Sequence, residues 1–124
     1  MNSLRILARA PSNIAIVKYM GKRDPGRNIP ANPSISLTLS GLCTYVEVRA
    51  SGSGGVRLIA EKPEGAKGDS PRLSPAGQEK FLLHFARVIE RAPELLRDFG
   101  LASRNPPEHV ELRTSNTFPA AAGI

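Results

Sequence analysis

Hydrophobic and polar residues alternate in several short stretches of the chain, and a period of two is typical of β-strands that bury one face. The strands expected from this alternation and from short apolar runs are residues 6–10, 14–17, 34–39, 44–49, 56–60 and 110–114. Ile35, Leu37 and Leu39 share the predicted inner face of one of these strands. Residues 44–49 repeat the same period, so we expect them to pair antiparallel with residues 34–39.

Proline and glycine residues mark the expected connections between the strands. Pro11 ends the first strand, and residues 14–17 are apolar at consecutive positions, which predicts a strand buried on both faces. The glycine run 52–55 is expected to close a hairpin with residues 56–60. No helix start follows this run, so it lacks what a phosphate-binding loop requires. Residues 62–75 contain three prolines and two glycines and predict a mobile surface loop.

One amphipathic helix is predicted after this loop. Ser74 is a suitable N-cap and Pro75 fits the first helical position. Apolar residues then recur at a spacing of three and four, namely Phe81, Leu82, Phe85, Ala86, Val88 and Ile89. Pro93 is expected to end the helix near residue 92, and residues 94–100 are expected to add a short separate turn of helix. His84 lies beside the apolar stripe and is interpreted as a boundary residue of the helix.

Composition limits the class of protein. With 124 residues, 40% of them hydrophobic and 23% charged, the chain has the size and balance of one globular domain. A single cysteine, Cys43, excludes an intramolecular disulfide, and two histidines are too few for a structural zinc cluster. No apolar run approaches the roughly 18 residues of a membrane span, and residues 1–5 do not resemble a signal peptide. We therefore expect a cytoplasmic protein with no membrane partner.

The net charge of +6 is concentrated at the start of the chain. Residues 1–28 hold six bases and one acid, whereas the other 96 residues are nearly neutral. The loop expected at residues 21–33 carries Lys22, Arg23 and Arg27 outward. Aromatic residues make up only 5% and tryptophan is absent, so the stacking platforms of a nucleic-acid interface are scarce. The pattern favours a compact anion such as a diphosphate and no nucleic acid.

Two segments are more specific than a strand pattern requires. The first has the sequence APSNIAIVKYMGKRD at residues 10–24 and continues as IPANPSISLTL at residues 29–39. The second is SNTFPAAAGI at residues 115–124. Together they resemble the amino-terminal part of the mevalonate diphosphate decarboxylase family, within the superfamily of galactose, homoserine, mevalonate and phosphomevalonate kinases. The resemblance covers almost the whole chain.

This resemblance implies both a fold and a reaction. The implied fold is α+β, the amino-terminal part of a two-domain small-molecule kinase fold with a ribosomal-protein-like left-handed β-α-β domain, mainly antiparallel strands and one main helix. The implied enzyme is a lyase of isoprenoid biosynthesis. It uses ATP and Mg²⁺ to phosphorylate the tertiary 3-hydroxyl of mevalonate 5-diphosphate, and loss of phosphate and carbon dioxide then yields isopentenyl diphosphate. The complete enzyme is expected to be a homodimer.

The resemblance also implies which residues bind. Lys18, Tyr19, Met20, Gly21 and Lys22 match the family's substrate-contacting stretch. The Tyr19 hydroxyl and the Lys22 ammonium would face the diphosphate, and Gly21 would let the backbone approach it. Met20 departs from the family, which usually has tryptophan there.

The second segment matches the start of the family's ATP phosphate-binding loop, which gives Ala122 and Gly123 a cofactor-binding role by resemblance. The family's catalytic base corresponds to a position beyond Ile124. Residues 1–124 are therefore expected to be an incomplete amino-terminal domain, inactive without the remainder of the enzyme and with apolar sheet faces left uncovered. The family's arginine near the helix start falls at Gly77, and its role is not transferred to Arg72 or Lys80.

Two alternatives stay open. A related mevalonate or phosphomevalonate 3-kinase, or a monophosphate decarboxylase, would share the fold and change the chemistry. A more distant alternative is an RNA-binding or anion-binding module, which the positive charge would suit.

Overall fold

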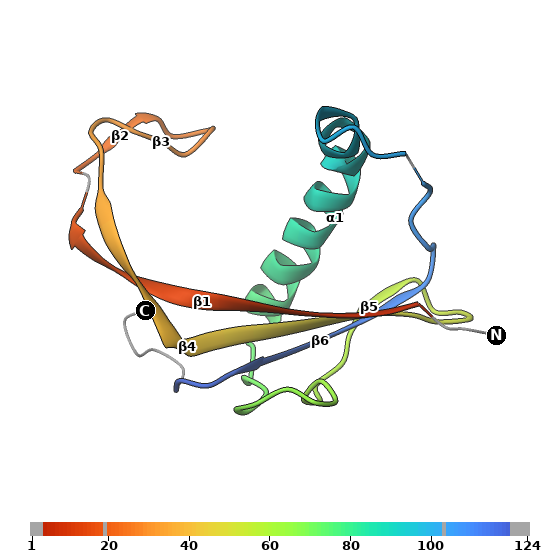
Figure 1. Cartoon of the computed structure of the whole chain (residues 1–124). Coiled ribbons are helices and arrows are strands. Elements are labelled where there is room, and N and C mark those ends of the chain that lie inside the picture. Colours follow the sequence, from red (N-terminus) through yellow and green to blue (C-terminus); the bar gives the residue numbers. More distant parts are fainter. Residues whose placement is uncertain (1–3, 19, 103, 120–124) are drawn as a thin grey trace.

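The computed structural model describes residues 4–18, 20–102 and 104–119. Its elements in chain order are β1 (Arg5–Val17), β2 (Lys22–Asp24), β3 (Ile29–Pro30), β4 (Ile35–Ala50), β5 (Val56–Leu58), α1 (Pro75–Asp98) and β6 (Val110–Asn116). Four strands form one sheet in the order β1-β4-β6-β5, and β2 pairs with β3 in a separate small hairpin (Figure 1). The prediction of an α+β fold with mainly antiparallel strands and one main helix is confirmed.

β1 and β4 are each longer than the sequence pattern predicted. β1 contains both strands expected on either side of Pro11, and β4 contains both residues 34–39 and residues 44–49. The prediction that these two stretches pair with each other was wrong, because both pair with β1 instead. The ladder shifts register between Pro11 and Ser12, and such an irregularity bends a strand without ending it.

The predicted hairpin after the glycine run was also wrong. β5 pairs parallel to β6, with Val56 opposite Val110, so β5, α1 and β6 form a β-α-β unit. Gly54 and Gly55 adopt positive φ angles of 94° and 66°, which turn the chain toward β6. There the Gly55 N–H donates to Nδ1 of His109 at 3.0 Å. Hydrogen bonds to β6 therefore replace the expected pairing with β4.

The helix begins where predicted and ends later. The Ser74 hydroxyl accepts a hydrogen bond from the Gly77 N–H at 3.1 Å, which confirms the N-cap. The helix continues through Pro93 to Asp98, so the predicted end near residue 92 was wrong. Beyond the C-cap residue Phe99, Gly100 adopts a φ of 67° and donates its N–H to the Arg97 carbonyl, a left-handed conformation that an L side chain would strain.

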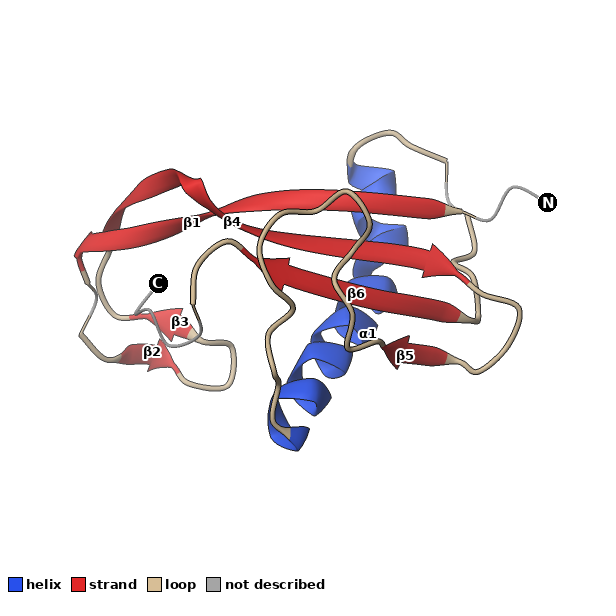
Figure 2. Cartoon of the chain, turned by 90° about the horizontal axis from the view of Figure 1, so that it is seen from below, coloured by secondary structure: helices blue, strands red, loops and turns tan. Residues whose placement is uncertain are grey.

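The two faces of the sheet differ in chemistry. Ile6, Val48 and Leu112 are paired neighbours, and Ile6 and Val48 line the cleft between the sheet and α1. The opposite face carries charged side chains and is crossed by the chain between β5 and α1 (Figure 2). We call residues 61–69 the crossing segment. It was predicted to be a mobile surface loop, yet Pro63 and Ala66 within it are buried.

Several large apolar side chains remain open to solvent. Past the register shift only two strands lie side by side in the described chain, so Ile14, Ile16, Ile35 and Leu37 are 48–61% exposed. The predicted burial of residues 14–17 and the inward position of Ile35 and Leu37 were therefore wrong for this chain. A cleft of about 600 Å³ lined mainly by apolar side chains also separates α1 from the sheet. No helix among the described residues is long and apolar enough to cross a membrane.

Candidate functional site

The first sequence motif forms an arm that projects from the sheet. Ser12 to Val17 of β1 pair with Ile35 to Leu39 of β4, and the β2–β3 hairpin lies at the far end (Figure 1). We call this unit, residues 12–18 and 20–39, the basic arm. The two halves of the motif are separated in sequence but become paired neighbours here. The motif is therefore one structural unit.

Side-chain and backbone hydrogen bonds shape the predicted substrate-contacting stretch. The Met20 N–H donates to the Asn32 side-chain oxygen at 2.9 Å, and the Ala31 N–H donates to the Gly21 carbonyl at 3.3 Å. Gly21 has a φ of 78°, a left-handed conformation that favours glycine. A Cβ built there would meet no atom within 4 Å, so glycine is required by the backbone angle and leaves open space around it.

Positive charge gathers on the basic arm without compensation. Lys18, Lys22, Arg23 and Arg27 are exposed, and none of them forms an ion pair with another residue of the described chain. The nearby Asp24 carboxylate accepts the Arg27 backbone N–H at 3.1 Å. Unpaired, solvated cations on a short hairpin create a local positive potential suited to a small polyanion.

The predicted contact residues differ in what the structure shows of them. Lys18 directly follows β1, Gly21 directly precedes β2, and Lys22 lies opposite Pro30 in the β2–β3 hairpin. Met20 is 83% exposed, so it packs against little of the described chain. Tyr19 lies outside the described residues.

The second motif is anchored where the basic arm leaves the sheet. Thr117 exchanges two hydrogen bonds with Cys43, from its N–H to the Cys43 carbonyl at 3.0 Å and from the Cys43 N–H to its hydroxyl at 2.9 Å. Cys43 is itself paired with Pro11, so both motifs meet at this point. Cys43 is buried in β4. Ala122 and Gly123 lie outside the described residues.

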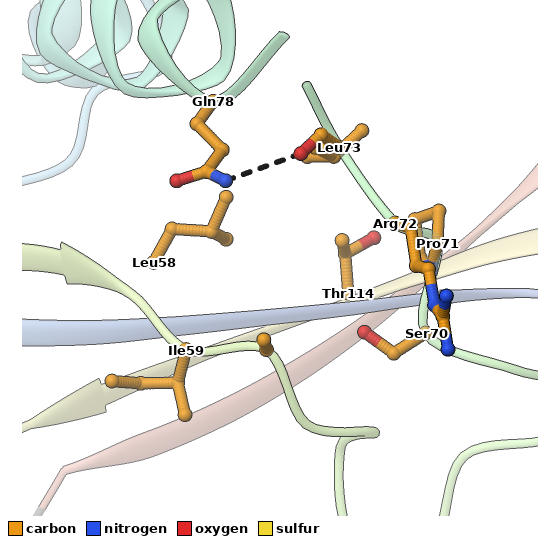
Figure 3. A pocket seen from close by; sticks show the side chains of 9 residues that line it. Leu58, Ile59, Ser70, Pro71, Arg72, Leu73, Gln78 and Thr114 are labelled. Atoms are coloured by element: carbon orange, nitrogen blue, oxygen red, sulfur yellow. Dashed lines mark hydrogen bonds between the residues drawn. The ribbon is translucent and has the colours of Figure 1, made fainter. Parts of the chain in front are cut away.

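Two adjoining cavities flank the second motif. One of about 520 Å³ lies between residues 116–119 and residues 68–72. The other, of about 390 Å³, shares Ser70, Pro71 and Arg72 and extends toward the start of α1. Figure 3 shows this second cavity, with the Gln78 side chain donating to the Leu73 carbonyl at 3.1 Å.

One residue that lines both cavities is an arginine to which the sequence analysis assigned no role. Arg72 lines both cavities and is exposed. Gly77, where the family's arginine would fall, offers only its N–H, and that group caps the helix. Within the described part of the chain, no three histidine, cysteine, aspartate or glutamate side chains form a group that could hold a metal ion.

A buried charge cluster on the face opposite α1 was missed by sequence reasoning. The Glu47 side chain is 0% exposed and contacts Arg5, Arg49 at 3.1 Å and Arg113 at 3.5 Å. Burial alone would raise the pKa of Glu47, but hydrogen bonds and attraction from Arg5 and Arg49 lower it below the ordinary value. A usable signal existed, because Glu47 and Arg49 are two residues apart on one strand and must share a face.

Comparison with known proteins identifies relatives along almost the whole chain. The family of diphosphomevalonate decarboxylase-like N-terminal domains matches residues 10–124. The diphosphomevalonate decarboxylase of Debaryomyces hansenii is 56% identical over 123 residues, covering 94% of this chain and 29% of that protein. The crystal structure of the Legionella pneumophila mevalonate diphosphate decarboxylase has 31% identity and a TM-score of 0.65, covering 98% of this chain and 34% of that chain.

A third relative supports the shared fold alone. The mevalonate diphosphate decarboxylase of Enterococcus faecalis, solved for its mevalonate diphosphate mediated ATP binding mechanism, has 24% identity and a TM-score of 0.56. It covers 98% of this chain and 32% of that chain. The chain thus spans about a third of the length of the relatives it matches.

Proposed function

Since the chain belongs to the family of diphosphomevalonate decarboxylase-like N-terminal domains, we propose that it forms the amino-terminal part of an ATP-dependent diphosphomevalonate decarboxylase. The complete enzyme would convert mevalonate 5-diphosphate to isopentenyl diphosphate with release of carbon dioxide, ADP and phosphate. The observation that carries the proposal is the basic arm, which unites both halves of the first motif and presents unpaired cations at its tip.

The arm residues would bind the diphosphate of the substrate. Lys18 and Lys22 supply ammonium groups, which act on phosphate oxygens as compact charges and form strong charge-assisted hydrogen bonds. Gly21 keeps the backbone free of a side chain at the point where the anion would approach. Tyr19 would add a hydroxyl donor, and the exposed Met20 would cover an apolar part of the substrate.

The proposed chemistry explains why cations are needed beside the substrate. A tertiary hydroxyl is a poor leaving group, whereas its phosphate ester leaves readily as the carboxylate supplies electrons to the forming double bond. Phosphoryl transfer to that hydroxyl depends on positioning and on neutralising charge. ATP would donate the phosphoryl group and Mg²⁺ would neutralise charge on it, with Ala122 and Gly123 in the loop that holds the ATP phosphates. The basic arm would bind and orient mevalonate 5-diphosphate, the acceptor of the phosphoryl group.

Other expectations drawn from the sequence and from the family resemblance stay predictions. These are the homodimer, the location in the cytoplasm, the position of the catalytic base outside this chain, and the extent of the domain beyond residues 1–124. The lack of a nucleic-acid partner also stays a prediction.

The proposal is tested by joining residues 1–124 to the remainder of the Debaryomyces hansenii enzyme and incubating the product with mevalonate 5-diphosphate and ATP. Release of both carbon dioxide and isopentenyl diphosphate is the expected result. Phosphate transfer without carbon dioxide would instead assign the chain to a related 3-kinase. Turnover of a monophosphate in preference to the diphosphate would indicate a monophosphate decarboxylase.

The role of Lys22 is tested in the same enzyme. Lys22→Met should raise the KM for mevalonate 5-diphosphate by about tenfold to a hundredfold, because a hydrogen bond to a charged group contributes roughly 1.5–3 kcal/mol. Lys62→Met is a matched control, since Lys62 is an exposed lysine away from the arm. Equal KM values for the two variants would remove Lys22 from the binding site.

A further inference from the structure

The arginines around Glu47 all reach the crossing segment as well. Arg113 lies 2.9 Å from the Glu111 carboxylate, 3.5 Å from that of Glu47 and 3.6 Å from that of Glu61. Arg49 lies 3.1 Å from Glu47 and 3.6 Å from Glu64. Arg5 pairs with Glu47 and donates to the Glu64 carbonyl. Each of these three arginines therefore links one buried carboxylate to the crossing segment.

Glu47 is the common point of this arrangement. It is fully buried, whereas the Glu61 and Glu64 side chains are 71% and 83% exposed. Exposed ion pairs contribute little by themselves because water screens them. A buried carboxylate, in contrast, fixes the direction of each guanidinium that donates to it. Glu47 therefore orients Arg5 and Arg49 toward the crossing segment, and it shares the orientation of Arg113 with Glu111.

The far end of the crossing segment is tied to the second motif. The Ser115 hydroxyl donates to the Lys67 carbonyl at 2.9 Å. Asp69 and Asn116 exchange two backbone hydrogen bonds of 3.0 and 2.9 Å. Gly68 lies so close that a Cβ there would stand 2.0 Å from the Asn116 carbonyl oxygen. A shift of the crossing segment must therefore move the start of the second motif.

Asn116, at the end of β6, lines the cavity of about 520 Å³ that lies between residues 116–119 and residues 68–72. We propose that Glu47 is a positioning residue, which holds the crossing segment on the sheet through Arg5, Arg49 and Arg113 and thereby sets the position of residues 116–119 beside this cavity. Its importance for catalysis rests on the proposed function, because residues 116–119 lead into the predicted ATP phosphate-binding loop. Its effect on position does not rest on that function.

Hydrogen exchange measured by mass spectrometry on the 124-residue chain tests the positioning directly. Glu47→Gln should speed exchange at residues 61–69 and 116–119 by at least about tenfold, because Arg5 and Arg49 lose their buried charged acceptor and Arg113 loses one of its carboxylate contacts. Exchange in α1 should stay as in the unchanged chain. Glu47→Asp keeps the charge and should restore part of the protection. Glu94→Gln is the matched control, since Glu94 is an exposed carboxylate that pairs only with Arg91 among the described residues.

Three results would overturn the proposal. The first is faster exchange at residues 61–69 with no change at residues 116–119. The second is an equal increase throughout the chain, which would indicate general destabilisation. The third concerns a fallback variant for the case that Glu47→Gln does not fold. The double variant Glu61→Gln/Glu64→Gln removes both exposed carboxylate contacts of the crossing segment while keeping Glu47 paired, and unchanged exchange at residues 116–119 in that variant would overturn the proposal.

Activity of the joined enzyme gives an independent readout. Glu47→Gln should lower kcat or raise the KM for ATP by at least about tenfold, with little change in the KM for mevalonate 5-diphosphate. An equal effect on both KM values would contradict a role at the phosphate loop. If the joined enzyme with native Glu47 makes no isopentenyl diphosphate, the proposed function fails while the exchange result still decides the positioning role.

Discussion

Gly68 is the residue at which a single added carbon should loosen the crossing segment. Its φ of 79° lies in the left-handed region, and a Cβ there would stand 2.0 Å from the Asn116 carbonyl oxygen and 2.8 Å from the Thr117 nitrogen. Both atoms belong to the backbone, so no side-chain rotation can relieve the overlap. Gly68→Ala must therefore separate the crossing segment from β6.

The expected loss of stability follows from three terms. A left-handed backbone costs an L residue roughly 1–2 kcal/mol. Moving packed backbone to make room costs roughly 1–3 kcal/mol more. The two hydrogen bonds between Asp69 and Asn116 would weaken, and each contributes about 0.5–1.5 kcal/mol. The total is about 2–8 kcal/mol, a large fraction of the roughly 5–15 kcal/mol that stabilises a typical domain.

Urea unfolding followed by circular dichroism measures this loss as a lower midpoint at constant slope. Gly52→Ala is the matched control, because Gly52 has no positive φ and a Cβ there would meet no atom within 4 Å. That variant should be neutral or slightly more stable, by up to about 1 kcal/mol. Equal midpoints for the two variants would refute the close approach of Gly68 to β6 on which this reasoning depends.

Two further predictions concern acid and activity. Because the pKa of Glu47 is lowered in the folded chain, its contribution to stability is complete above the unfolded pKa of about 4.3 and is lost as the pH falls through the lower folded pKa. Thermal unfolding measured between about pH 5 and 2 should therefore show a steeper fall of Tm with falling pH in the native chain than in Glu47→Gln. Parallel curves for the two proteins would contradict the assignment. Residues 1–124 alone should release no ADP from ATP in the presence of mevalonate 5-diphosphate, because by family resemblance they hold diphosphate contacts but no catalytic base, and a coupled ADP assay checks this. Turnover that survives repurification and disappears in Lys22→Met would show that the catalytic groups lie within this chain.

Local features of the sequence were enough to predict several elements. The helix start at Ser74 and Pro75 depends on contacts within one turn, and the alternation at residues 110–114 produces a strand whose inner residues are buried. The basic arm was also foreseeable in part, because its charge and turn residues are local properties. The role of its cations came from the family resemblance and stays a prediction.

Predictions that depended on partners far along the chain were less successful. Pro11 did not end β1, because a register shift opposite β4 accommodates it. Pro93 did not end α1, and Leu95 and Leu96 continue the helix after it. The partner of β5 is β6, more than fifty residues away, and no local pattern specifies a parallel neighbour.

The sequence by itself determined the α+β class, the helix start, the concentration of positive charge and the family. Only the tertiary structure decided that Glu47 is buried beneath Arg5 and Arg113, since these residues come from three different strands and become neighbours through the register of the sheet. The same register places the crossing segment against the second motif. Caps, turns and alternation depend on residues close in sequence, so the sequence alone predicts them. Strand register joins positions more than sixty residues apart, such as Glu47 and Arg113, so their contact is visible only in the tertiary structure.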